Sequence, residues 1–266
     1  MTSNFWNPYR SMKGKTRLAW GVGSFLCVIA VWSAIAMTGW VSDYKLPSPL
    51  AVLKALSYMA WFEGKSMLLD ATLASVSRVA MAGVAVVVIG VPFGILLGAS
   101  PTLNAMFSPI LDPFRSAPVV AFLPLFVMWF GIDEFMKVSF LFVGAVVYLI
   151  PMVRDAVKAV PSQYYVSAQD IGGTQWECIV KALVPMAMPR IADSIIVSVS
   201  LMWTYITVAE YVNAGSGLGQ LIQNARRFSA MDQVFAGILV IVIVALISHQ
   251  LMTFAKRKLY PWETQS

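Results

Sequence analysis

The sequence predicts an all-α, polytopic membrane protein with six membrane-spanning helices. Of its 266 residues, 59% are hydrophobic and only 12% are charged. Soluble domains carry about 25% charged residues, so this chain has too little polar surface for a water-soluble globule. Its long uncharged runs have the length of spanning helices, whereas a membrane β-barrel would show short segments of alternating polarity.

The chain opens with a polar segment, 1–17, followed by an apolar run, 18–40. This run is too long for the core of a signal peptide, so we expect it to be a retained first span. Ser48 and Pro49 then predict a helix start, because serine caps the first turn and proline suits its geometry. The resulting short helix is expected to end near Met59 and to lie at the membrane surface.

A second helix start is expected near Ser66, and this helix should run into the second span at 74–97. Gly90, Gly94 and Gly98 recur at every fourth position along it. Residues at this spacing share one face of a helix, and glycines there let another helix approach closely. The second span is therefore predicted to pack tightly against a neighbour.

The third and fourth spans are predicted at 118–131 and 135–153. The segment before the third span is interrupted by Pro109, Pro113 and Pro118. Broken backbone at membrane depth is tolerated where it is buried in protein or lines a wet cavity. Lys137, near the start of the fourth span, is expected to extend its side chain to the membrane surface.

The fifth and sixth spans are predicted at 194–210 and 233–255, separated by a glycine-rich loop and a polar helix. A basic tail, 256–266, follows. Six spans place both termini on one side of the membrane. That side carries 12 of the 19 basic residues, and the other side carries six, with Arg78 at a boundary. The positive-inside rule therefore places both termini in the cytoplasm. The net charge of +6 is explained by this topology, so it does not indicate nucleic acid binding.

Residues 161–189 stand out because they are polar and lie between apolar runs on the cytoplasmic side. We call this segment the elbow. Its first helix should begin after Pro161 and stop at Gly172, since glycine readily takes the left-handed conformation that ends a helix. Thr174 and Glu177 fit a capping box that starts a second helix, and Pro185 is expected to mark its end.

The elbow resembles the signature loop of permease subunits of binding-protein-dependent ABC importers. That loop reads E-A-A, three residues, G, nine residues, I, one residue, L-P. Ala168, Gly172 and Pro185 match its second alanine, its glycine and its proline at the correct spacing. The departures are Val166 for the glutamate, Ser167 for the first alanine, Ala182 for the isoleucine and Val184 for the leucine.

Other stretches resemble the nitrate, sulfonate, taurine and bicarbonate branch of this family. They are LPSP at 46–49, GVPFGILLGASP at 90–101, DPFRSAPVVAFLPLFVMWFGI at 112–132 and AEYVNAGSGLGQLI at 209–222. The resemblance implies the type I ABC importer (MetI-like) permease fold in the cytoplasmic (inner) membrane of a bacterium. It also implies a small anionic solute.

The resemblance further implies the partners. The elbow would dock on a cytoplasmic ABC ATPase subunit, which binds ATP and Mg; this chain would bind no cofactor and catalyse no reaction itself. An extracytoplasmic substrate-binding protein and a second permease copy would complete the importer. The residues expected to contact the ATPase are Tyr165, Ala168, Gln169, Asp170, Gly172, Thr174, Trp176 and Pro185.

Candidate pathway residues are polar groups within the apolar runs, because ionisable and hydroxyl groups are costly in lipid. They are Arg115, Ser198, Trp203, Tyr205 and Glu210. Arg115 could present positive charge to an anion, or its ion pair could hold the proline-broken segment. Glu210 could face the path, or it could tie the fifth span to the following glycine loop.

Two other functions stay open at the level of sequence. An ion-coupled secondary transporter would need no ATPase, and it predicts repeated broken helices in both halves of the chain. A membrane enzyme is disfavoured, because the sequence has no HExxH motif, no Ser–His–Asp set and no histidine cluster. Cys27, Cys178 and the single histidine, His249, show no metal-ligand spacing.

Overall fold

The computed structural model describes residues 14–42, 44–61, 66–212 and 215–265, and this part of the chain contains only helices and turns. The predicted segment 1–17 therefore lies outside the described residues as far as residue 13. The long helices are α1 (Gly14–Met37), α3 (Met67–Ala99), α6 (Glu134–Lys158), α9 (Val184–Tyr211) and α11 (Met231–Leu259). The shorter ones are α2 (Pro49–Ala60), α4 (Pro101–Phe114), η2 (Val119–Phe122), α5 (Leu123–Phe130), α7 (Ser162–Asp170), α8 (Gln175–Glu177), η3 (Cys178–Leu183), α10 (Leu218–Arg227) and η4 (Pro261–Gln265).

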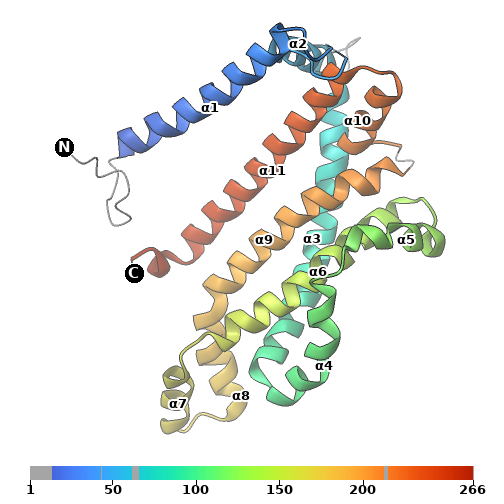
Figure 1. Cartoon of the computed structure of the whole chain (residues 1–266). Coiled ribbons are helices and arrows are strands. Elements are labelled where there is room, and N and C mark those ends of the chain that lie inside the picture. Colours follow the sequence, from blue (N-terminus) through green and yellow to red (C-terminus); the bar gives the residue numbers. More distant parts are fainter. Residues whose placement is uncertain (1–13, 43, 62–65, 213–214, 266) are drawn as a thin grey trace.

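Helices α3, α6 and α9 form the centre of an elongated bundle, as Figure 1 shows. Helices α2 and α10 lie at one end of it, and α7 and α8 lie at the other. We call the latter the elbow end. Both starts predicted for the early helices are confirmed: the Ser48 hydroxyl accepts a hydrogen bond from Ala51 N at 3.2 Å, and Ser66 accepts one from Leu69 N at 3.1 Å.

Five helices in the described residues are long and apolar enough to cross a membrane, and α4 with η2 and α5 makes a sixth crossing if the bent pair counts as one span. The third predicted span, 118–131, coincides with η2 and α5. Helix α5 has only eight residues, and α4 meets the η2–α5 segment at 87°. The cause is Pro118, which disfavours helical backbone at the preceding residue and cannot donate a hydrogen bond.

The close packing that the sequence predicted for the second span is confirmed, and its partner is α6. A Cβ atom added at Gly94 would lie 2.6 Å from Val153 Cβ, and one at Gly98 would lie 2.6 Å from Val157 Cβ. At Gly90 the nearest atom, in Leu149, would be at 3.0 Å. The two backbones approach so closely because these glycines carry no side chain.

Helix α1 lies apart from the bundle along most of its length (Figure 1). Its apolar spanning window has no buried residue. It is fixed near its end by Trp32, whose ring stacks on Phe235 of α11 and whose Nε1 donates to Pro47 O at 3.1 Å. The exposed apolar side chains of α1 therefore need lipid or another protein chain around them.

A buried ion cluster joins α3, α6 and α9 at the end opposite the elbow. We call it the Arg78 cluster; its members are Ser75, Arg78, Glu134, Lys137, Glu210 and Ser216. The guanidinium of Arg78 uses all five of its N–H groups. Nε and Nη2 each donate to Glu134. Nη1 donates to Glu210 and to Ser216 O, and Nη2 also donates to Ser216 Oγ.

Glu210 holds the glycine-rich loop against the end of α9. Its carboxylate accepts from Gly219 N at 2.7 Å and from the Ser75 hydroxyl at 2.7 Å. Gly217 has φ +126°, and a Cβ atom there would strike the Glu210 carboxyl group. The loop must therefore have glycine at this point, because it wraps directly over a buried carboxylate.

The structure corrects the prediction for Lys137. Its side chain is buried and does not reach the surface; Nζ donates to Glu134 Oε1 at 2.8 Å. Glu134 thus serves two buried cations, Lys137 and Arg78. Both cations are neutralised by carboxylates, which avoids the cost of leaving buried charges unpaired.

The close α3–α6 contact predicts that Gly94→Ala destabilises the protein. The added methyl group would also lie 2.9 Å from Ile150 O, and such overpacking costs about 1–3 kcal/mol. The matched control is Gly83→Ala on the same helix, where the methyl group would meet Val199 Cγ2 at an ordinary 3.8 Å. Thermal unfolding in detergent should show a lower Tm for Gly94→Ala and an unchanged or higher Tm for Gly83→Ala. Equal Tm values for the two variants would contradict the close contact.

Replacing Glu210 with Gln should also lower stability. The amide keeps the shape of the side chain but removes the charge that faces the buried Arg78, and a hydrogen bond to a charged group contributes about 1.5–3 kcal/mol. Asp133→Asn is the control, because Asp133 is exposed and makes no side-chain cap to α6. The readout is the fraction of monodisperse protein after heating. A Glu210→Gln variant as stable as Asp133→Asn would argue against the ion cluster.

Candidate functional site

The elbow connects α6 to α9 and protrudes from the bundle (Figure 1). Helix α7 ends as the sequence predicts. Gly172 has φ +90°, Gly172 N donates to Gln169 O at 2.8 Å, and Gly173 N donates to Ala168 O at 3.1 Å. These two bonds form a Schellman motif, which satisfies carbonyl groups at the end of a helix. A Cβ atom at Gly173 would lie 2.6 Å from Ala168 O, so this turn depends on both glycines.

The second half of the elbow starts with the predicted capping box. Thr174 Oγ1 accepts from Glu177 N at 3.3 Å, and Glu177 Oε2 accepts from Thr174 N at 3.1 Å. Cys178 is buried behind the turn, and Lys181 pairs with Glu177 at 2.8 Å. Caps on both sides of the glycine turn fix the direction of the two helices relative to each other.

The structure corrects the predicted end of the second elbow helix at Pro185. The helix continues from α8 through η3 into α9, so that 175–211 is one helical run. Pro185 lacks the N–H group that an uninterrupted α-helix would use. The turn before it, η3, is a π-helix, and this wider turn lets the chain pass the proline without stopping. The fifth span therefore begins before residue 194.

The elbow exposes several apolar side chains although its sequence is largely polar. Its exposed apolar side chains are Tyr164, Val166, Ile171, Trp176 and Val180. Ile171 is 88% exposed and Trp176 63%. Exposed apolar groups on an element that protrudes from the bundle are a feature of surfaces that bind a partner. We call these five residues the elbow face.

The residues predicted to contact a partner here differ in exposure. Gln169, Asp170, Gly172, Thr174, Trp176 and Pro185 are exposed, whereas Tyr165 and Ala168 are half-buried. Ala168 contributes through its carbonyl group, which closes the Schellman motif. The sequence prediction missed Ile171, the most exposed member of the elbow face. Its apolar side chain, directly before the glycine stop of a polar segment, was the available signal.

A second ion cluster lies at the elbow end, between α4 and α6. We call it the Arg154 cluster; its members are Ser108, Asp112, Arg115, Arg154 and Asp155. Arg154 is buried, whereas the carboxylates and Arg115 are more exposed. Arg115, predicted as a pathway residue, ends α4 and pairs with Asp155 at 3.6 Å. This contact corresponds to the ion pair considered as its alternative role.

The other pathway candidates lie on α9 and are buried. Ser198 donates to Ser194 O within its own helix at 2.9 Å. The ring of Tyr205 packs on Phe140 and over Gly144, where a Cβ atom would lie 2.8 Å from it. Trp203 Nε1 has no hydrogen-bond partner among the described residues. Glu210 belongs to the Arg78 cluster. These side chains share one helix, but only Glu210 enters an ion cluster.

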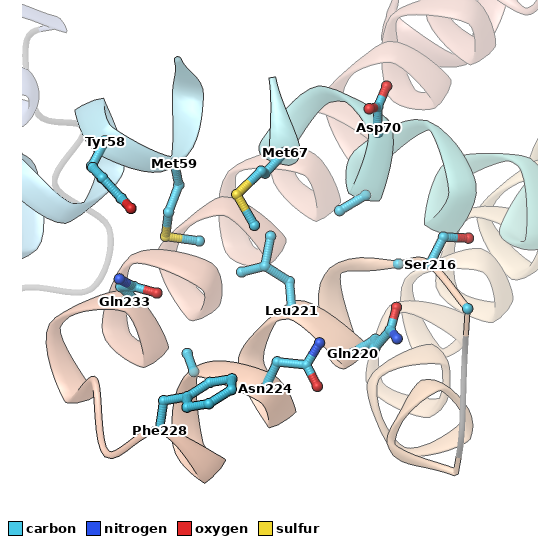
Figure 2. A pocket seen from close by; sticks show the side chains of 14 residues that line it. Tyr58, Met59, Met67, Asp70, Ser216, Gln220, Leu221, Asn224, Phe228 and Gln233 are labelled. Atoms are coloured by element: carbon cyan, nitrogen blue, oxygen red, sulfur yellow. The ribbon is translucent and has the colours of Figure 1, made fainter. Parts of the chain in front are cut away.

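A hollow of about 460 Å³ lies beside the Arg78 cluster, at the end opposite the elbow. Figure 2 shows Met59, Met67 and Leu221 meeting at its centre, with the amides of Gln220 and Asn224 on the α10 side. Ser216, which Arg78 holds, forms part of the wall. The hollow thus adjoins the glycine loop that the buried ions fix in place.

Comparison with known proteins assigns the family. Residues 90–260 match the model of the binding-protein-dependent transport system inner membrane component. The taurine transport system permease protein TauC of Escherichia coli (strain K12) is 32% identical over 91% of this chain and 88% of its own length. The aliphatic sulfonates permease protein SsuC of Bacillus subtilis (strain 168), described as putative, is 29% identical over 95% of this chain and 91% of its own length.

Solved structures show the same fold. A chain of the MetNI methionine ABC transporter in an inward-facing conformation superposes with a TM-score of 0.65 at 22% identity, covering 74% of this chain and 99% of its own. A chain of an amino acid ABC transporter gives 0.64 at 16% identity, covering 78% and 98%. The family decides between the two transport mechanisms that the sequence left open. The chain belongs to the inner membrane components of binding-protein-dependent transport systems, and it is a multi-pass permease subunit of an ABC importer.

Proposed function

We propose that this permease subunit couples to a cytoplasmic ATPase through the elbow. The observation that carries the proposal is the elbow face, a group of exposed apolar side chains on a rigid, doubly capped turn beyond the bundle. Apolar side chains exposed to water favour burial against a partner. Rigidity matters as well, because a flexible element would absorb a displacement, whereas a capped one passes it to the adjoining helices.

The elbow end is then the cytoplasmic end, and the predicted topology places both termini on the same side of the membrane. ATP and Mg bind to the ATPase, and this chain contributes no catalytic group. An extracytoplasmic binding protein docks at the opposite end, where the hollow of Figure 2 opens beside the glycine loop. A second copy of the chain completes the path; the exposed apolar side chains of α1 and of α5, among them Met128 and Trp129, are available for this contact.

We further propose that the solute is a small sulfonate of the taurine type. The support is the similarity to the taurine and sulfonate permeases, which extends over nine-tenths of this chain. Of the solutes that the sequence left open, we therefore prefer a sulfonate to nitrate or bicarbonate. Ser198, Trp203 and Tyr205 are proposed to lie near the path, since they place polar atoms on the long helix that leads out of the elbow.

The elbow face predicts a loss of ATPase binding in Ile171→Ser. At a central contact such a change costs about 2 kcal/mol or more, which weakens the complex by about thirtyfold or more. Phe228→Ser is the matched control, because Phe228 is 85% exposed and lies at the opposite end of the bundle. Pull-down of the tagged permease in mild detergent, with the ATPase quantified, should recover the ATPase with wild type and Phe228→Ser but little with Ile171→Ser. Equal recovery with all three would exclude the elbow face as the docking surface.

The proposed solute predicts ATP-driven uptake of taurine. Proteoliposomes that contain the permease, its ATPase and its binding protein should accumulate labelled taurine only when ATP is supplied on the ATPase side. An alkylsulfonate in excess should reduce this uptake more than nitrate or bicarbonate does. Uptake that continues without ATP but stops when an ionophore collapses the ion gradients would refute the importer mechanism. ATP-driven uptake of nitrate in preference to taurine would refute only the solute.

A further inference from the structure

The Arg154 cluster lies where α6 is about to leave the bundle. Helix α6 ends at Lys158, and α7 of the elbow begins at Ser162, only four residues later. Arg154 is 8% exposed, so its charge is withdrawn from water about one turn before the end of α6. A buried guanidinium needs several acceptors to offset its loss of hydration. The positions of those acceptors indicate what the residue connects.

Arg154 connects α6 to α4. Its Nη1 donates to Ser108 Oγ at 2.7 Å and to Asp112 Oδ1 at 3.0 Å, two positions one turn apart on α4. Its Nε donates to Asp155 Oδ1 at 2.9 Å, which fixes the guanidinium against its own helix. One side chain therefore links two successive turns of α4 to the last turns of α6.

Asp155 adds a second tie at the adjacent position. Its other oxygen lies 3.6 Å from Arg115 Nη1, and Arg115 is the residue that ends α4. The cluster holds two arginines and two aspartates, so it is neutral. Directional bonds between neutralised charges hold a fixed register between helices, whereas apolar contacts such as Phe93 with Phe107, between α3 and α4, can slide.

The segment that follows this end of α4 shows why the tie matters for transport. Beyond Arg115 the chain bends by 87° into η2 and α5. A displacement of the elbow reaches the end of α6 through a link of a few residues. The Arg154 cluster would then transmit this displacement from α6 to α4 and to the bend. Figure 1 places α4 beside the lower part of α6, at the same end of the bundle as the elbow.

We propose that Arg154 is a positioning residue that makes α4 and the bent segment move with the elbow. The inference rests on the proposed function, because it takes the elbow as the point where the ATPase acts. The moving unit consists of α7, the last turns of α6, and α4. Without Arg154 the ATPase still binds and moves the elbow, but α4 no longer follows.

The test measures whether α4 and the elbow keep a fixed separation during the ATPase cycle. In a chain with Cys27→Ser and Cys178→Ala, spin labels are placed through Ala105→Cys on α4 and Gln163→Cys on α7, both at exposed positions. Labelled chain is diluted with unlabelled chain in the assembled importer. The label-to-label distance is measured by pulsed electron resonance, without nucleotide and with ATP trapped by vanadate.

The expected wild-type distance is the same in both states. In Arg154→Gln the distance should shift or broaden when ATP is trapped. Lys158→Gln is the control, because Lys158 is an exposed cation on the same end of α6, and it should behave as wild type. A wild-type distance that changes between states, or an Arg154→Gln distance as constant as wild type, would overturn the proposal.

A second measurement separates transmission from simple damage to the fold. In proteoliposomes, Arg154→Gln should keep ATP hydrolysis and ATPase binding while the taurine moved per ATP falls about fivefold or more, a typical size for the loss of one coupling interaction. Parallel loss of hydrolysis and transport would refute the positioning role. If the wild-type permease retained no ATPase, the proposed function itself would fail. If it retained the ATPase and Arg154→Gln transported normally, only this inference would fail.

Discussion

The close contact between α3 and α6 is the constraint on which the rest of the structure depends. Three glycines bring the two backbones together over the C-terminal parts of both helices, and an ion cluster ties α6 to its neighbours near each of its ends. The Arg78 cluster joins it to α3, α9 and the glycine loop, and the Arg154 cluster joins it to α4. In lipid, helices gain little from the hydrophobic effect when they associate, so close packing and paired polar groups must hold them together.

The sequence was sufficient wherever the determining residues are neighbours in the chain. Ser48, Ser66 and Thr174 cap helices within three residues of themselves, and Gly172 ends one locally. The glycines at every fourth position likewise revealed the close packing of α3, although they could not identify α6 as its partner. These features follow from backbone geometry and helix periodicity, which a single sequence contains. The glycine turn of the elbow and the caps on both sides of it, which are built from such local signals, were therefore predictable.

The sequence was insufficient where partners are far apart or where two local effects compete. Arg78 finds Glu134 and Glu210 at separations of 56 and 132 residues, and no local pattern indicates such pairs. From the sequence alone, Arg78 was therefore assigned only to the boundary of a span, and the side chain of Lys137 was expected to extend to the membrane surface. Pro118 and Pro185 show the second problem. Each removes the same N–H group, yet one accompanies a sharp bend and the other a continuous helix, because the preceding turn can widen at only one of them.

The wide turn at Cys178–Leu183 has a consequence for how the elbow is aimed. A π-helical turn holds more residues than an α-helical turn of similar height, and each residue of an α-helix rotates the chain by about 100° about its axis. The number of residues in this stretch therefore sets the azimuth of the glycine turn, that is, its direction around the axis of α9. Side chains in the stretch can vary while that azimuth is kept, but the loss or gain of a single residue would rotate the whole turn to another side of the molecule.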